Sequence, residues 1–279
     1  MNFETTEDRI VSALGWISLE HDVSIIYACE SGSRAWGFAS EDSDYDVRFV
    51  YAHHRDWYTS VDSCSKRDVI DGVDTGSNGM KRDLDIAGWD LRKALGLFRK
   101  GNPPFLEWIN SPIKYVDRYN FRQDVDKLAE THLNKATVVM HYVHMAFGNW
   151  RKYLKGDAAV VPMKKYLYVV RPLCAAIYLT ELEMGLSYPL PLMPPVNFEH
   201  LLSAVERRLP PGLAGAIAVL IEAKRGGAEL SSGPRIPELD EWISVLEAEW
   251  EGASPGRARL SVPIEELNEL FKRLLEVTI

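Results

Sequence analysis

The chain has 279 residues, of which 46% are hydrophobic and 26% are charged, with a formal net charge of −8 at pH 7. These values predict a globular protein with a sizeable core, in one large domain or two ordinary ones. The acidic balance excludes a surface coated with positive charge for bulk nucleic-acid binding, but it leaves room for a local basic groove.

The first fifty residues predict a helix, two strands and a phosphate-binding turn. Residues 8–19 carry apolar side chains at helical spacing. Residues 23–29 form a short apolar run that is typical of a buried strand, and residues 44–51 predict a second strand. Gly32 and Ser33 lie in the turn between them, where a residue without Cβ lets backbone N–H groups approach a phosphate and a hydroxyl adds a donor.

Alternation along the 44–51 strand predicts that Asp44, Asp46 and Arg48 share one face. The opposite face is apolar and carries Tyr45, Val47, Phe49 and Tyr51. Burying the apolar face would fix the register, because a slip of one residue would send both aspartates into the core. Two carboxylates that point the same way suit Mg²⁺ held together with substrate phosphates, whereas the alternative is a polar strand edge.

Spacing excludes two other phosphate or metal motifs in this stretch. Gly32 and Gly37 have the spacing of a P-loop, but Phe38 stands where that motif requires lysine. The run that begins at Asp42 matches the acidic positions of an EF-hand loop, but Val47 stands where the loop requires glycine. A nucleoside triphosphate site with a divalent metal remains the best interpretation.

Further elements complete an α+β half that is expected to end near residue 118. Strands are expected at about 67–73 and 81–87, and a helix at 90–100 stops at Gly101. Asn102 is expected to cap a short helix that begins at Pro103.

Beyond residue 119, strand signals fade and helical periodicity takes over. The expected helices are 121–133, 136–155, 162–184, 197–208, 215–225, 238–250 and 263–277. Segments rich in proline and glycine predict the loops between them. The sequence thus predicts an α+β fold in which a mixed β-sheet core with flanking helices (1–118) is followed by an all-α domain (119–279).

Four motifs in this order resemble one family: SGSRAWGFASEDSDYDVRFVY, GWDLRKAL, GNPPFLEWINSP and MKKYLYVVRPL. The glycine-serine turn and the Asp-x-Asp strand resemble the DNA polymerase beta-like nucleotidyltransferase superfamily. The four motifs together resemble its RNA-ligase-associated branch in RNA repair, over roughly residues 20–185. The resemblance implies transfer of a nucleoside monophosphate from an NTP to an acceptor hydroxyl, with an RNA end expected and two Mg²⁺ or Mn²⁺ ions as cofactors. It also implies a functional association with an RNA ligase and a helical domain that completes the cleft.

The superfamily pattern further implies a third carboxylate on a neighbouring strand. Asp85 is the choice, because apolar residues flank it immediately before a helix start. Asp83 would share its strand face and is the main rival, and a structural role for Asp85 as a cap or an arginine partner is the alternative. The weaker candidates lie in a glycine-rich region and are Asp68, Asp71 and Asp74.

The resemblance assigns catalysis and metal binding to three carboxylates: Asp44, Asp46 and Asp85. Ser33 and the backbone amides near Gly32 would hold the β- and γ-phosphates, and Arg34 would add positive charge there. Arg48 is interpreted either as part of this site or as a structural counter-ion that keeps the aspartates ionised.

In the helical half, the resemblance implies nucleotide contacts from Asn149, Lys164, Tyr168 and Arg171. Lys165 and Tyr166 extend this set into a basic and aromatic cluster that would grip a phosphate or an RNA end. The basic residues of the 90–100 helix are expected to form an ordinary solvated face.

Two other function classes stay open. A nucleotidyltransferase that modifies a small molecule or a protein side chain would keep the same aspartates. A catalytically silent nucleotide- or RNA-binding protein is disfavoured by Asp85.

Cysteine usage and the amino terminus both favour the cytoplasm. The three cysteines are scattered and odd in number, which predicts free thiols in a reducing compartment. The first residues are acidic and polar where a signal peptide would be basic and then apolar, and residues 166–186 are interrupted by charged residues and proline. We expect neither secretion nor a membrane partner.

Overall fold

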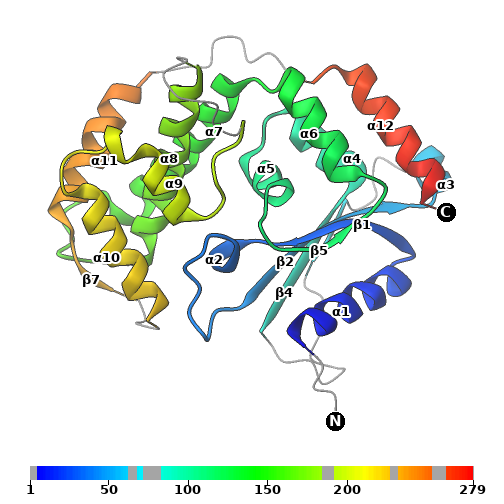
Figure 1. The fold of residues 1–279 in the computed structure, drawn as a ribbon, viewed down its shortest axis with the longest axis horizontal. Coiled ribbons are helices and arrows are strands. Elements are labelled where there is room, and N and C mark those ends of the chain that lie inside the picture. The colour runs from blue at the N-terminus through cyan, green and yellow to red at the C-terminus, as the bar shows by residue number, and fades with distance from the viewer. Residues whose placement is uncertain are drawn as a thin grey trace. The chain divides into compact units, whose positions relative to one another are not determined.

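A computed structural model shows the chain as two compact units, drawn as a ribbon in Figure 1. The structure describes residues 5–61, 68–71, 83–183, 192–226, 232–252 and 262–278. The first unit, here the sheet unit, comprises residues within 1–35, 43–133 and 260–279. The second, here the helical unit, comprises residues within 36–42 and 134–259.

Within the described residues, the sheet unit contains a five-stranded mixed sheet in the order β3-β4-β2-β1-β5. Its strands are β1 (Val23–Glu30), β2 (Tyr45–His53), β3 (Val69–Ile70), β4 (Leu84–Asp90) and β5 (Lys114–Asp117). β1 runs antiparallel to β2 and β5, whereas β2 and β4 are parallel. The predicted α+β fold with a mixed sheet is confirmed. The edge strand β5 was not predicted, since it is short and carries no clear apolar alternation.

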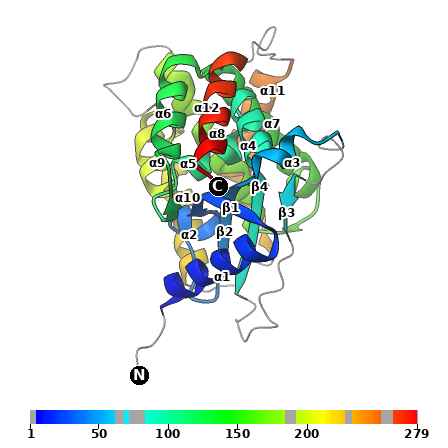
Figure 2. The same cartoon turned by 90° about the vertical axis from the view of Figure 1, so that its right-hand side faces the viewer.

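Helix α1 (Thr6–Glu20) covers one face of the sheet, as Figures 1 and 2 both show. Thr5 and Asp8 form a capping box at its start, in which each side chain accepts the backbone N–H of the other residue. One hydrophobic cluster joins the apolar side chains of α1 and β2: Ile10, Leu14, Ile17, Val47, Phe49 and Tyr51. The apolar face of β2 is therefore buried as predicted, and this burial fixes the strand register.

The opposite face of the sheet carries four helices (Figure 2): α4 (Leu91–Arg99), α5 (Pro103–Ile109), α6 (Phe121–His132) and α12 (Ile264–Val277). Asp90 caps α4 by accepting the Arg92 N–H over 2.8 Å, and Asn102 caps α5 as predicted. A polar contact between Nε2 of His132 and Oε1 of Glu266, 2.9 Å apart, ties α6 to α12. The compact units are thus discontinuous in sequence, and the expected domains 1–118 and 119–279 stay a prediction.

Two short helices lie on the connections of the sheet unit. α2 (Gly32–Ala35) follows β1, and α3 (Arg55–Thr59) follows β2. The Tyr58 hydroxyl of α3 donates to the buried Asp90 carboxylate over 2.6 Å, which ties this connection to the end of β4.

The helical unit contains α7 (Lys135–Asn149), the π-helical turn η3 (Trp150–Leu154), α8 (Lys164–Glu183), α9 (Phe198–Val205), the 3₁₀ turn η4 (Glu206–Arg208), α10 (Leu213–Arg225) and α11 (Pro237–Trp250). The helices expected here are confirmed, with ends shifted by a few residues. Two features were not predicted: the π-helical turn, and a small ladder between β6 (Val160–Val161) and β7 (Gly233–Pro234). In the described ranges, no helix combines the length and the apolar character needed to cross a membrane.

Two cysteines can be compared with the sequence expectation. Cys29 on β1 and Cys174 on α8 are both buried and carry free thiols, as predicted. Burial raises the pKa of the Cys174 thiol to about 12, so it stays protonated and unreactive. Cys64 lies outside the described residues.

Candidate active site

The turn after β1 brings glycine backbone against the Asp46 carboxylate. Gly32 has a φ of +57°, in the left-handed region that favours glycine. A Cβ on Gly32 would lie 1.9 Å from Oδ2 of Asp46, far inside contact distance. The Ser31 N–H also donates to the Asp46 carbonyl over 2.8 Å. Gly32 is therefore required both by its conformation and by the space that Asp46 takes, while phosphate binding by Gly32 and Ser33 stays a prediction.

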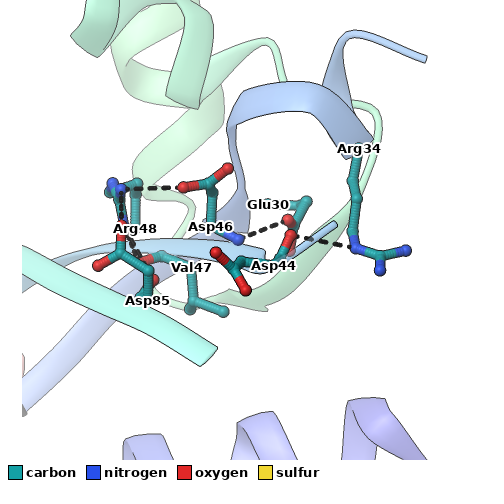
Figure 3. A network of polar contacts seen from close by, with 7 residues as sticks. All are labelled: Glu30, Arg34, Asp44, Asp46, Val47, Arg48 and Asp85. Atoms are coloured by element: carbon teal, nitrogen blue, oxygen red, sulfur yellow. Dashed lines mark hydrogen bonds and ion pairs between the residues drawn. The ribbon is translucent and has the colours of Figure 1, made fainter. Parts of the chain in front are cut away.

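The parallel pairing of β2 and β4 places two of the predicted carboxylates side by side. Asp46 and Asp85 are register partners on these neighbouring strands. Residues in register on adjacent strands project from the same face of the sheet. Asp44 lies one residue before β2, so strand alternation does not fix its side chain, and Figure 3 shows its carboxylate pointing away from that of Asp46.

Arg48 joins the two facing aspartates (Figure 3). Its Nη2 lies 2.7 Å from Oδ2 of Asp85 and 3.3 Å from Oδ1 of Asp46. Its Nη1 donates to the Asp85 carbonyl over 2.8 Å. Arg48 thus stands as a counter-ion to both aspartates, which is the structural interpretation that the sequence allowed.

The site keeps a surplus of negative charge despite Arg48. Burial raises the pKa of Asp46, Arg48 opposes that rise, and the neighbouring carboxylates of Asp85 and Asp44 add to it. The Asp85 side chain is 58% exposed and that of Asp46 is 29% exposed, so a charged substrate or ion can reach both. A cation placed between them would relieve their repulsion.

These residues fit a divalent metal ion by donor type, but not by their present placement. Carboxylate oxygens are the ligands that Mg²⁺ prefers. Across the ranges that the structure describes, however, no three carboxylate, histidine or cysteine side chains gather as a metal centre. Arg48 lies where an ion shared by Asp46 and Asp85 would lie. An ion at this position therefore requires the Arg48 guanidinium to move aside.

Glu30 is a buried part of this site that the sequence reasoning missed. Its Oε1 accepts the Asp46 N–H over 2.8 Å, and its Oε2 accepts the Tyr115 hydroxyl over 2.5 Å. Burial raises the pKa of Glu30, and these two hydrogen bonds oppose that rise. The available signal was a charged residue at the end of the apolar strand β1, next to the glycine-serine turn. Glu30 holds the backbone of Asp46 in place from the side of β1.

Arg34 contacts the start of β2. Its guanidinium lies 3.7 Å from the centre of the Tyr45 ring. It donates to the backbone carbonyls of Ser43 and Asp44, over 2.6 and 3.3 Å. These bonds hold the loop that carries Asp44, and the predicted contact of Arg34 with phosphate stays a prediction.

The rival candidates for the third carboxylate have other partners. Asp83 lies 3.0 Å from Nη2 of Arg9, before β4 begins. Asp68 lies 3.0 Å from Nζ of Lys93. Asp74 is outside the described residues. Asp85 is the candidate that the sheet register brings to Asp46.

The residues implied in the helical unit have different surroundings. Tyr168 meets the Trp36 ring edge-on at 5.7 Å, and Nζ of Lys164 lies 5.8 Å from the Tyr168 ring centre. Arg171 is buried, with its guanidinium 4.5 Å from the Trp36 ring centre. Asn149 donates to a backbone carbonyl one turn earlier in α7. Arg171 therefore has a packing role inside this unit, and nucleotide binding by all four residues stays a prediction.

Comparisons with known proteins cover nearly the whole chain. The family model described as "RlaP: RNA repair pathway DNA polymerase beta family" matches residues 6–273. The chain is also 37% identical over 271 residues to a protein of Bacillus subtilis (strain 168), "Uncharacterized protein YcgL". That alignment covers 97% of this chain and 96% of the Bacillus protein.

Proposed function

The chain belongs to the RNA repair pathway DNA polymerase beta family, and from this membership we propose that it is a metal-dependent nucleotidyltransferase. It would transfer a nucleoside monophosphate from an NTP to the hydroxyl of an RNA end. The family description names the superfamily and the pathway, and the acceptor and the metal dependence are part of the proposal.

One observation carries the proposal: Asp46 and Asp85 face each other in register beside a glycine that leaves no room for a side chain. The two facing carboxylates repel each other, and the single positive charge of Arg48 offsets only part of their negative charge, so the pair can still attract a further cation. Burial is the main cause of the raised pKa of Asp46, and the neighbouring carboxylates of Asp85 and Asp44 add to it. Phosphoryl transfer by this superfamily needs such carboxylates beside a triphosphate.

Each residue of the site has a definable task in this proposal. Divalent ions, when bound, would neutralise phosphate charge and lower the pKa of the attacking hydroxyl. Asp46 and Asp85 would hold them, with Asp44 on the triphosphate side. Glu30 fixes the backbone of Asp46 through the hydrogen bond described above. The N–H groups of the turn at Gly32 would orient the phosphates.

The test is an incorporation assay with the full-length protein. Purified protein is incubated with each of the four α-³²P-labelled NTPs and a single-stranded RNA, with Mg²⁺, with Mn²⁺ or with EDTA. We expect label on the RNA with at least one NTP and no label in EDTA. The Asp46→Asn variant, checked for its melting temperature, should lose the transfer.

Three results would change the proposal in distinguishable ways. Transfer that survives in Asp46→Asn would overturn the assignment of the site. Label on the protein or on a small acceptor would keep the reaction and replace the acceptor. Label that persists in EDTA would remove the metal from the mechanism.

A second candidate function rests on Arg48. Its bonds to both aspartates occupy them in the way expected of a catalytically silent nucleotide- or RNA-binding protein. The two candidates differ in how the protein responds to Mn²⁺. A silent protein would bind NTP without a divalent ion, whereas the transferase should bind it more tightly when Mn²⁺ is added.

A further inference from the structure

A π-helical turn on the helical unit presents a lysine and a tyrosine side by side. η3 continues α7 and contains Lys152 and Tyr153. π-helical turns inside helices are uncommon and often occur at functional sites, because the extra residue redirects the side chains that follow. Lys152 is exposed and Tyr153 is partly exposed. The turn therefore places a cation and an aromatic ring at the surface.

Buried carboxylate contacts anchor this turn. Glu247 of α11 accepts a hydrogen bond from Nε1 of Trp150 over 3.0 Å. The same carboxylate pairs with Arg151 and Lys155, at 2.6 and 3.0 Å. Glu247 supplies the negative charge beside Arg151 and Lys155, the two cations that flank Lys152 and Tyr153 in the sequence. The contacts with Glu247 of α11 thus hold the turn on its buried side, and Lys152 and Tyr153 lie on its surface side.

The first turn of α8 is anchored in the same way. The Tyr166 hydroxyl donates to Asp240 over 2.8 Å, and Asp240 also pairs with Arg235 at 2.6 Å. Arg235 in turn donates to the Leu154 carbonyl over 2.7 Å, so η3 and α8 share one network. Tyr166 of the predicted cluster therefore points inward and has a structural role.

Lysines and tyrosines alternate across the surface that these anchors present. Nζ of Lys165 lies 4.3 Å from the Tyr153 ring centre and 4.9 Å from that of Tyr168. Nζ of Lys152 lies 4.9 Å from the Tyr153 ring centre. Within the described part of the chain, Lys152, Lys164 and Lys165 have no acidic partner, unlike their neighbours Arg151 and Lys155. Among the described residues, the three lysines of this surface thus carry positive charge that no acidic side chain pairs with, on a chain of net charge −8.

We propose that this surface, here the lysine-tyrosine face (Lys152, Tyr153, Lys164, Lys165 and Tyr168), binds a single-stranded segment of the acceptor RNA. Single-stranded nucleic acid is bound by lysines that follow the phosphates and by aromatic rings on which bases stack. Stacking tolerates any base, so the face would hold an RNA end without reading its sequence. That the bound RNA is the acceptor rests on the proposed function, whereas RNA binding by the lysine-tyrosine face can be tested independently.

The charge part of the proposal predicts a salt dependence. The affinity of the protein for a fluorescein-labelled single-stranded RNA is measured by fluorescence anisotropy at several salt concentrations, without NTP or metal. The Lys152→Ala/Lys165→Ala double variant should bind more weakly, and its log–log salt slope should fall by about 1.4, because each phosphate contact on a single strand contributes about 0.7. A matched control, Lys127→Ala/Lys272→Ala, removes two exposed lysines of the sheet unit and should leave slope and affinity unchanged.

The stacking part of the proposal predicts a difference between two substitutions at one position. Tyr153→Ala should weaken RNA binding roughly 5- to 160-fold, the range measured for loss of one stacked base. Tyr153→Phe keeps the ring and should bind RNA as the unchanged protein does. Trp16→Ala, at an exposed aromatic residue of α1, is the control and should have no effect.

Failure of this inference differs from failure of the proposed function. Unchanged RNA affinity in both the double-lysine and the Tyr153→Ala variants would overturn the RNA face, even if nucleotidyl transfer occurs. Loss of ATP affinity in these variants, with RNA affinity intact, would also overturn it and assign the face to the triphosphate. Loss of RNA affinity would support the face, whether or not the protein transfers nucleotides.

Discussion

The sheet unit and the helical unit concentrate opposite charges by different means. In the sheet unit, strand pairing brings Asp46 and Asp85 together, and their negative charge exceeds what Arg48 supplies. In the helical unit, the buried Glu247 carboxylate pairs with Arg151 and Lys155, whereas Lys152 and Lys165 have no acidic partner among the residues that the structure describes. A sheet thus builds a site from backbone register, which tolerates little change, whereas a helical surface builds one from side-chain anchors. Substitutions in the two units should therefore fail in different ways.

The largest effect is expected at Asp85, where activity should fall without loss of the fold. Asp85→Asn removes a carboxylate that faces Asp46 and is 58% exposed, so the sheet should stay intact. We expect the single-turnover rate of nucleotidyl transfer to fall about 100- to 1000-fold, the usual cost of losing one electrostatic group at a reaction centre. Asp83→Asn, two residues away and paired with Arg9, is the matched control. Equal losses in both variants would remove Asp85 from the site.

In the helical unit the largest effect should be on stability. Glu247→Ala leaves the buried Trp150 N–H without its acceptor and separates Arg151 and Lys155 from their carboxylate. We expect a loss of about 2–3 kcal/mol in the free energy of unfolding, measured by urea denaturation. Glu247→Gln keeps an acceptor for Trp150 and should lose less. A loss below about 0.5 kcal/mol in Glu247→Ala would show that the π-helical turn does not depend on this anchor.

Substitutions at two glycines, Gly32 and Gly15, should have opposite effects on stability, because of the two only Gly32 has a left-handed backbone conformation. Gly32→Ala should destabilise the protein by about 1–2 kcal/mol, because its backbone is left-handed and its Cβ would meet Asp46. Gly15→Ala lies inside α1 with no atom within 4 Å of the added Cβ, and it should stabilise by about 0.5–1 kcal/mol. Thermal unfolding of both variants checks the opposite signs. A neutral or stabilising Gly32→Ala would contradict the close approach to Asp46.

The smallest effect concerns the pH dependence of stability through Glu30. Its folded pKa is raised above the ordinary value of 4.5, so between these two values the folded state holds a proton that the unfolded chain releases. Stability therefore falls as pH rises through that window, and it does not recover above the folded pKa. Glu30→Gln cannot titrate and should lose this part of the fall, so unfolding free energies of the two proteins should diverge as pH rises. If the unfolding free energies of the two proteins changed with pH in parallel, the pKa of Glu30 would not be raised in the folded state.

The sheet side of the molecule was largely predictable from its sequence. From Tyr45 to Phe49 in β2, apolar residues alternate with charged ones, and this pattern predicted both the buried face and the side on which Asp46 lies. The choice of Asp85 depended on the resemblance to the family, because the residues around it do not indicate which strand pairs with its own. Glu30 was missed, since a single charged residue at a strand end does not reveal that Asp46 and Tyr115 are its partners.

The helical side was predictable in its helices but not in its surface. The sequence predicted residues 136–155 as one continuous helix, because no proline interrupts the stretch and the single Gly148, two residues before Trp150, does not by itself indicate a change of helix type. The π-helical turn is stabilised by Glu247, which is 97 residues away from Trp150 along the chain. Long-range contacts of this kind leave no periodic signal. The cation and the ring at Lys152 and Tyr153 could therefore be found only in three dimensions.

The most direct test of the facing aspartates is Mn²⁺ binding, followed by electron paramagnetic resonance in the presence of a non-hydrolysable NTP. The unchanged protein should bind Mn²⁺ and broaden its signal, and Asp83→Asn should do the same. Asp46→Asn and Asp85→Asn should each bind it at least about 10-fold more weakly, because each removes a ligand. Equal Mn²⁺ affinity in all four proteins would contradict the claim that Asp46 and Asp85 form the metal site of a nucleotidyltransferase.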